Sequence, residues 1–118
     1  MQGRRADARN YLSRAVAIKP DYGLALTQLA WLLSTSSDTH VRQPAEGLRL
    51  ANQAVQMTQP PSAQALDVLA AALAASGQFD RAATTAEAAL ARAGDDRHIT
   101  SVIRARLELY KQHRPYIE

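Results

Sequence analysis

The sequence predicts an all-α domain, and three observations carry this prediction. Alanine, the strongest helix former, occurs 24 times among the 118 residues. Apolar residues recur at the i, i+3, i+4 and i+7 spacing of amphipathic helices in two stretches, LALTQLAWLL from Leu24 and AQALDVLAAAL from Ala63. Small residues recur seven positions apart in three further stretches. We therefore expect one domain of about six antiparallel helices, over residues 4–18, 22–35, 44–57, 62–76, 78–93 and 97–113.

The first predicted helix, residues 4–18, resembles one half of a helical hairpin whose other half is absent. It carries the small pair Ala8 and Ala15, and Pro20 follows it. A helix without its hairpin partner leaves a face to be covered, since stacked helical hairpins need polar surfaces at their ends. We therefore expect a homodimer through this face, or a chain that is the C-terminal part of a longer array.

The next four predicted helices form two hairpins that align with each other. The second hairpin begins near Gln64, and its first helix repeats four apolar positions of the hairpin before it. These aligned positions are Leu26 and Leu66, Leu29 and Leu69, Ala30 and Ala70, and Leu33 and Leu73. In the second helices, Gly47 and Ala54 correspond to Ala82 and Ala89. Such small residues let helix axes approach closely, so we expect them at close-packed seams.

The turn of the later hairpin contains Gly77, followed by Phe79. Glycine is the residue that reverses a chain after a helix with a positive φ, so we expect this conformation at Gly77. Phe79 is expected to fill the gap near the turn. The earlier hairpin has the polar sequence STSSDTHVRQ in place of a glycine turn, and Pro44 then suits the first position of a helix. We interpret the extra residues as a neutral lengthening, because a longer surface loop costs little stability.

The last predicted helix, residues 97–113, places Val102, Ile103, Leu107 and Tyr110 on one face. It indicates a closing helix, or a degenerate first half of another repeat. In the second case Leu107, Tyr110 and Tyr116 align with Ala70, Leu73 and Phe79.

The aligned positions fit a basic period of 34 residues, with five extra residues before Gly47 and one before Leu66. A helix–turn–helix unit of this length resembles the tetratricopeptide repeat (TPR), and the chain resembles the C-terminal part of a longer bacterial TPR protein. The resemblance implies a right-handed α-α superhelix. It divides the single domain, residues 1–118, into a half repeat (1–20), a repeat with a loop insertion (21–60), the best-matching repeat (61–95) and a C-terminal capping helix (96–118).

The composition offers little for catalysis or for a metal. The chain has no cysteine, and its three histidines lie far apart without a carboxylate at metal-ligand spacing. The adjacent Ser, Asp and His of SSDTH cannot converge as a catalytic triad on one short loop. No glycine-rich phosphate loop occurs. We therefore expect a protein that is not an enzyme and needs no cofactor or metal.

The charge and hydropathy restrict the partners. The net charge is +3, and twelve of the fourteen basic residues are arginines scattered along the chain, which is typical of solvated helix faces. Nucleic-acid binding through these arginines is therefore the less favoured alternative. No apolar run approaches the ~18 residues of a membrane span, and the basic N-terminus has no apolar segment of a signal peptide after it. These features favour a cytoplasmic protein without membrane contact.

The resemblance implies that the first helix of each hairpin lines a concave groove. By register, the residues facing it are Leu24, Thr27, Gln28, Trp31, Gln64, Asp67, Val68 and Ala71. Trp31, the only tryptophan, is either an interface anchor or a core residue between hairpins. With Asp67 and no lysine among them, these positions do not match TPR domains that clamp carboxylates. We expect a scaffold that binds a peptide or helix of a partner protein; the alternative is a structural cap of a longer array attached to a catalytic domain.

Overall fold

The computed structural model describes residues 2–57 and 59–118, which form six α-helices and no strand. The helices are α1 (Gln2–Ile18), α2 (Gly23–Thr35), α3 (Pro44–Met57), α4 (Ala63–Ala75), α5 (Phe79–Ala93) and α6 (Arg97–Lys111). The all-α prediction is confirmed, and each predicted range matches one helix to within two residues at either end.

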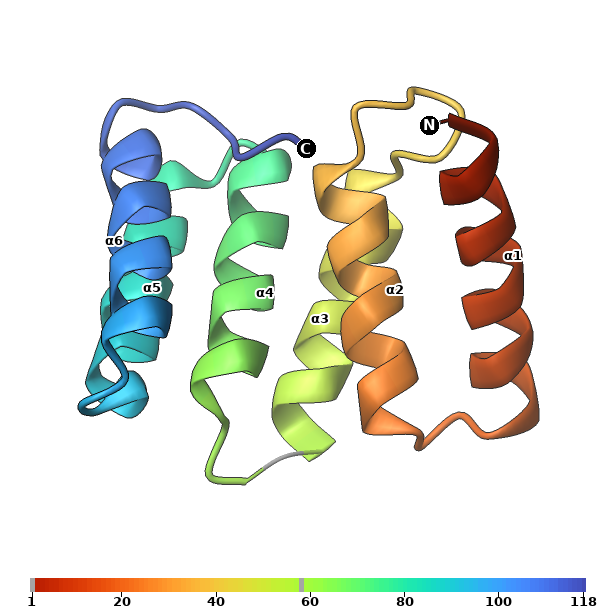
Figure 1. Ribbon diagram of the computed structural model, residues 1–118, viewed down its shortest axis with the longest axis horizontal. Helices are drawn as coiled ribbons and strands as arrows, with labels where there is room; N and C mark the ends of the chain where they lie inside the picture. Colours follow the sequence, from red (N-terminus) through yellow and green to blue (C-terminus); the bar gives the residue numbers. More distant parts are fainter. Residues whose placement is uncertain (1, 58) are drawn as a thin grey trace.

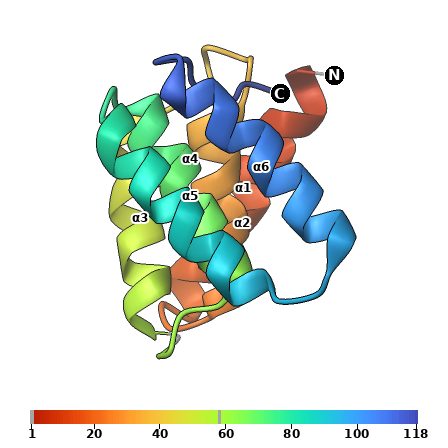
Figure 2. The same ribbon diagram turned by 90° about the vertical axis from the view of Figure 1, so that its left-hand side faces the viewer.

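The helices run up and down side by side, each packed on the next one along the chain (Figure 1). Two layers result. α2, α4 and α6 lie in front of α3 and α5 in Figure 1, and the turned view of Figure 2 separates α3 on one side from α6 on the other. Within the front layer α4 packs on both α2 and α6, while among the described helices α1 packs on α2 alone. The front layer thus presents a face made of alternate helices.

Buried apolar side chains of the described residues form two clusters, and α4 contributes to both. One face of α4, including Leu66 and Leu73, packs on α5 and α6. Its opposite face, through Val68 and Ala72, packs on α2 and α3. The alanine-rich α5 supplies the first cluster with Ala82, Ala86 and Ala89, all three fully buried. The small side chains of α5 are therefore at the close seam where the sequence predicts Ala82 and Ala89.

The turn after α4 has the geometry that the sequence predicts. Gly77 adopts a φ of 81°, its N–H donates to the carbonyl oxygen of Ala74 at 3.0 Å, and the Gln78 N–H donates to that of Leu73 at 2.9 Å. This pair of bonds is the Schellman motif that ends many helices. The expected positive φ at Gly77 is confirmed.

α6 ends in the same motif, but with His113 in the left-handed position at a φ of 58°. The His113 N–H donates to the Tyr110 carbonyl oxygen at 3.0 Å, and the Arg114 N–H donates to that of Leu109 at 2.9 Å. The imidazole ring stacks on the Phe79 ring, with 5.3 Å between the centroids. This turn directs residues 114–118 back across the domain, where Figure 1 shows them crossing the end of α4 toward the end of α2.

The seam between α2 and α3 explains why position 47 is glycine where the next hairpin has Ala82. A Cβ at Gly47 would lie 2.5 Å from the Ser34 hydroxyl oxygen and 3.3 Å from both the Ala30 carbonyl oxygen and the Ser34 nitrogen. Ser34 is fully buried, and its position in α2 corresponds to Ala74 in α4. The α2–α3 hairpin thus has Ser34 and Gly47 at the two positions where the α4–α5 hairpin has Ala74 and Ala82.

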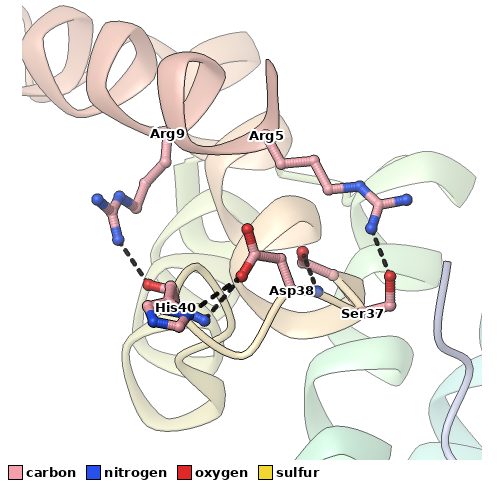
Figure 3. A network of polar contacts seen from close by, with 6 residues as sticks. Arg5, Arg9, Ser37, Asp38 and His40 are labelled. Carbon is pink, nitrogen blue, oxygen red and sulfur yellow. Dashed lines mark hydrogen bonds and ion pairs between the residues drawn. The ribbon is translucent and has the colours of Figure 1, made fainter. Parts of the chain in front are cut away.

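The loop between α2 and α3 is folded against α1 rather than extended into solvent (Figure 3). Arg5 donates to the Ser37 hydroxyl, and the Arg9 guanidinium donates to the His40 carbonyl oxygen at 2.9 Å. Inside the loop the Asp38 carboxylate accepts from the His40 N–H at 2.9 Å, and Val41 is fully buried. The loop residues therefore contact α1, whereas we expected the extra residues only to lengthen the loop without a structural role.

Candidate binding groove

A hollow of about 340 Å³ lies on the face formed by α2, α4 and α6. Six of the eight residues that the sequence places on the groove line it. They are Thr27, Gln28 and Trp31 of α2 and Gln64, Asp67 and Val68 of α4. Arg106 of α6 and Glu118 complete the lining. Side chains that are distant in the sequence thus converge on one surface.

Leu24 and Ala71 lie elsewhere. Leu24 is 51% exposed and borders a hollow of about 140 Å³ between α1 and α2, together with Tyr11 and Tyr22. Ala71 is 1% exposed, enclosed between α4 and its neighbours. Both positions therefore depart from the predicted groove: α2 lines the hollow with residues between Thr27 and Trp31, and α4 with residues between Gln64 and Val68, so that Leu24 precedes the first segment and Ala71 follows the second.

An ion pair between Asp67 and Arg106 lies at the centre of this surface. The two residues come from α4 and α6, and their side chains are only 13% and 14% exposed. Burial raises the pKa of the Asp67 carboxyl, and the Arg106 charge opposes this shift only in part. Asp67 Oδ1 and Arg106 Nε have no hydrogen-bond partner within residues 2–57 and 59–118. The pair therefore retains hydrogen-bonding capacity.

Two aromatic rings surround the Arg106 guanidinium. Its central carbon lies 4.6 Å from the Trp31 ring centroid and 4.8 Å from the Tyr116 ring centroid. The two rings are themselves 5.6 Å apart and tilted by 36°. Such cation–π contacts hold a cation over a ring face when it is partly desolvated. Trp31 packs on the cluster shared by α2, α3 and α4 and also lines the hollow.

The segment after α6 closes one end of the hollow. The Trp31 Nε1–H donates to Glu118 Oε1 at 3.0 Å. The Glu118 N–H donates to the Thr35 carbonyl oxygen at 2.7 Å, and the Ser37 N–H donates to the Glu118 main-chain oxygen at 3.0 Å. Residues 116–118 therefore lie along the end of α2, held by main-chain and side-chain bonds together.

A second hollow, of about 280 Å³, lies between α4 and α6. It shares Gln64, Asp67 and Arg106 with the first and adds His98, Ile99, Val102 and Ile103. Because the two hollows share three lining residues, they are adjacent on the face formed by α2, α4 and α6. We call this surface the groove below.

Arg106 and Glu118, which line the groove, and Tyr116, which contacts Trp31 and Arg106, were not predicted as site residues. The last helix was predicted as a closing helix or as a degenerate first half of another repeat, and neither interpretation linked these residues to Trp31. One signal was present: Asp67 is the only charged residue of α4. A buried carboxylate needs a partner, and the last helix carries several basic residues that could supply one.

Within the described ranges, no group of three or more His, Asp or Glu side chains is arranged to hold a metal ion. None of the described helices is both long and apolar enough to cross a membrane. Compared with protein-family models, with curated proteins and with solved structures, the chain shows no significant match.

Proposed function

We propose that this chain is a non-catalytic interaction scaffold, which binds a peptide or a helix of a partner protein in the groove. We further propose that its two layers of helices are a short right-handed superhelix of the TPR type. The repeated small residues at helix seams and the front layer of alternate helices support this architecture.

One observation carries the functional proposal: the groove gathers an aromatic anchor and several polar groups on a surface that the core does not require. Trp31 is partly exposed there, beside the exposed amides of Gln28 and Gln64. Tryptophan and arginine are the residues that most often dominate binding energy at interfaces. An apolar wall with a few converging polar groups is typical of recognition sites.

The test is selection of binding peptides from a random display library on the intact chain. Selected peptides are then titrated into two variants, Gln64→Arg in the groove and Gln56→Arg on an exposed position of α3. Bulk and charge in the groove should weaken binding at least about tenfold, a loss of about 1.4 kcal/mol, whereas the α3 variant should bind like the unmodified chain. Selected peptides that bind both variants equally well would contradict the proposal.

A second candidate interaction rests on the α1 surface, where Tyr11 is 76% exposed and Ile18 is 84% exposed. Tyr11 lines the hollow between α1 and α2 together with Tyr22 and Leu24, and Ile18 is the last residue of α1. A two-fold pairing of two copies would place Tyr11 of each chain against this hollow of the other. Light scattering over a concentration series should give a dimer mass, and Tyr11→Arg should return the monomer mass; a monomer at all concentrations refutes the pairing.

A further inference from the structure

We propose that the groove recognises an extended segment with an aromatic residue followed two positions later by an acidic residue. Residues 116–118, Tyr-Ile-Glu, occupy this place within the chain and compete with the partner. This inference rests on the proposed binding function and specifies the chemistry of the ligand.

The main-chain contacts define an extended ligand. Glu118 exchanges two hydrogen bonds with the residues on either side of Ser36, donating to Thr35 and accepting from Ser37. Neighbouring strands in a sheet pair in the same way. The Thr35 carbonyl is one of the last in α2, where a helix leaves its carbonyl oxygens without intrahelical partners. Any extended segment can supply this donor, so these bonds give affinity without sequence preference.

The side-chain contacts supply the preference. Side chains two positions apart in an extended segment point to the same side. Tyr116 accordingly contacts Trp31 and Arg106, and Glu118 accepts from the Trp31 indole, while the intervening Ile117 side chain is exposed. The positive guanidinium of Arg106 beside both contacts favours an electron-rich ring and a carboxylate over a basic ligand.

The segment fills only one end of the groove, so a longer ligand has additional contacts available. Thr27, Gln28 and Gln64 line the part of the hollow beyond Glu118, and the second hollow extends past His98. A partner that presents the same pattern on a longer segment therefore gains contacts that the chain's own residues do not make. The internal segment has the advantage of proximity, which corresponds to an effective concentration on the order of 1 mM for a short connection.

The test uses the intact chain and two pentapeptides, acetylated and amidated at their ends: RPYIE, the sequence of residues 114–118, and RPEIY, of the same composition. Binding is followed by the fluorescence of Trp31, the only tryptophan. The receptor is the variant Tyr116→Ala/Glu118→Ala, with Glu118→Ala alone as a milder form because this side chain lies at the surface. Glu108→Ala removes another exposed carboxylate, from α6, and serves as the matched control.

We expect RPYIE to bind the double variant saturably and RPEIY to bind at least about tenfold more weakly. If the internal segment covers the groove about 90% of the time, the unmodified chain and Glu108→Ala should bind RPYIE about tenfold more weakly than the double variant. Circular dichroism verifies that each variant is folded. If the double variant is unfolded, Glu118→Ala replaces it as the receptor in these titrations.

Three results would overturn the inference: no saturable binding of RPYIE to either variant, equal binding of RPEIY, or equal binding of RPYIE to the unmodified chain. The peptide selection above separates the two proposals. Groove-dependent peptides without the aromatic–x–acidic pattern would leave the binding function in place and remove this inference, whereas the absence of any groove-dependent peptide would remove both.

Discussion

The seam between α2 and α3 allows a quantitative test of how its packing is specified. Gly47→Ala should destabilise the chain, although alanine is favoured over glycine inside a helix by about 1 kcal/mol. The added Cβ would lie 2.5 Å from the Ser34 hydroxyl oxygen, in a seam where Ser34 is fully buried. Overpacking of this kind costs about 1–3 kcal/mol, so the expected net loss in the free energy of unfolding is about 1 kcal/mol.

Ser34→Ala should reverse the sign of the Gly47 substitution. It removes the atom that clashes, and it also removes a buried hydroxyl that has no hydrogen-bond partner among the described residues. In this background Gly47→Ala should raise the free energy of unfolding by about 1 kcal/mol, its intrinsic helix preference. The coupling energy between the two sites is therefore about 2 kcal/mol.

Urea denaturation of the four chains in this double-mutant cycle, followed by circular dichroism, measures the coupling. Gly23→Ala is the matched control, because a Cβ there meets no atom within 4 Å. Independent sites add to within about 0.5 kcal/mol. A coupling below that value, with Gly47→Ala equally favourable in both backgrounds, would refute the steric explanation of the serine–glycine pair.

Three further predictions concern the buried polar groups and a helix cap. Ser62→Ala should lower the free energy of unfolding by about 1 kcal/mol, because the Ser62 hydroxyl accepts a hydrogen bond from the Ala65 N–H at the start of α4. The control is Ser101→Ala, at an exposed site in α6, which should change the free energy of unfolding little. Tyr110→Phe should raise the midpoint of thermal unfolding, since the buried phenol has no hydrogen-bond partner within the described residues; a lower midpoint would contradict this. Burial raises the pKa of Asp67 above its ordinary 3.8, so the folded chain holds this proton more tightly than the unfolded one. Between the ordinary and the raised pKa, the contribution of Asp67 to the free energy of unfolding should therefore fall as pH rises, and this slope should be absent from urea titrations of Asp67→Asn.

The local features of the fold could be predicted from the sequence because each depends on neighbours along the chain. The positive φ of Gly77 follows from turn chemistry, and the burial of Ala82 and Ala89 follows from their seven-residue spacing. The small residue at position 47 could be predicted from the same spacing, but the reason that it is glycine depends on Ser34 in another helix.

The groove could be predicted only on the helices with a clear register. The resemblance to the TPR placed the groove on α2 and α4, and the register of these helices then gave its residues: Thr27, Gln28, Trp31, Gln64, Asp67 and Val68. The path of residues 114–118 could not be predicted, because it depends on the left-handed turn at His113, a residue that seldom adopts this conformation. Because this path was unknown, the contacts of Tyr116 and Glu118 with Trp31 could not be predicted from the sequence.

The shared position of α4 has a consequence for how the chain loses its structure. In a simple linear array each unit can melt by itself, because it contacts only its neighbours. Here one helix supplies buried side chains to both hydrophobic clusters, so removing it exposes the apolar surface of α2 and α3 together with that of α5 and α6. Five of the six helices are thereby joined into one cooperative block, and α1, which packs on α2 alone among the described helices, is the element that can detach without breaking it.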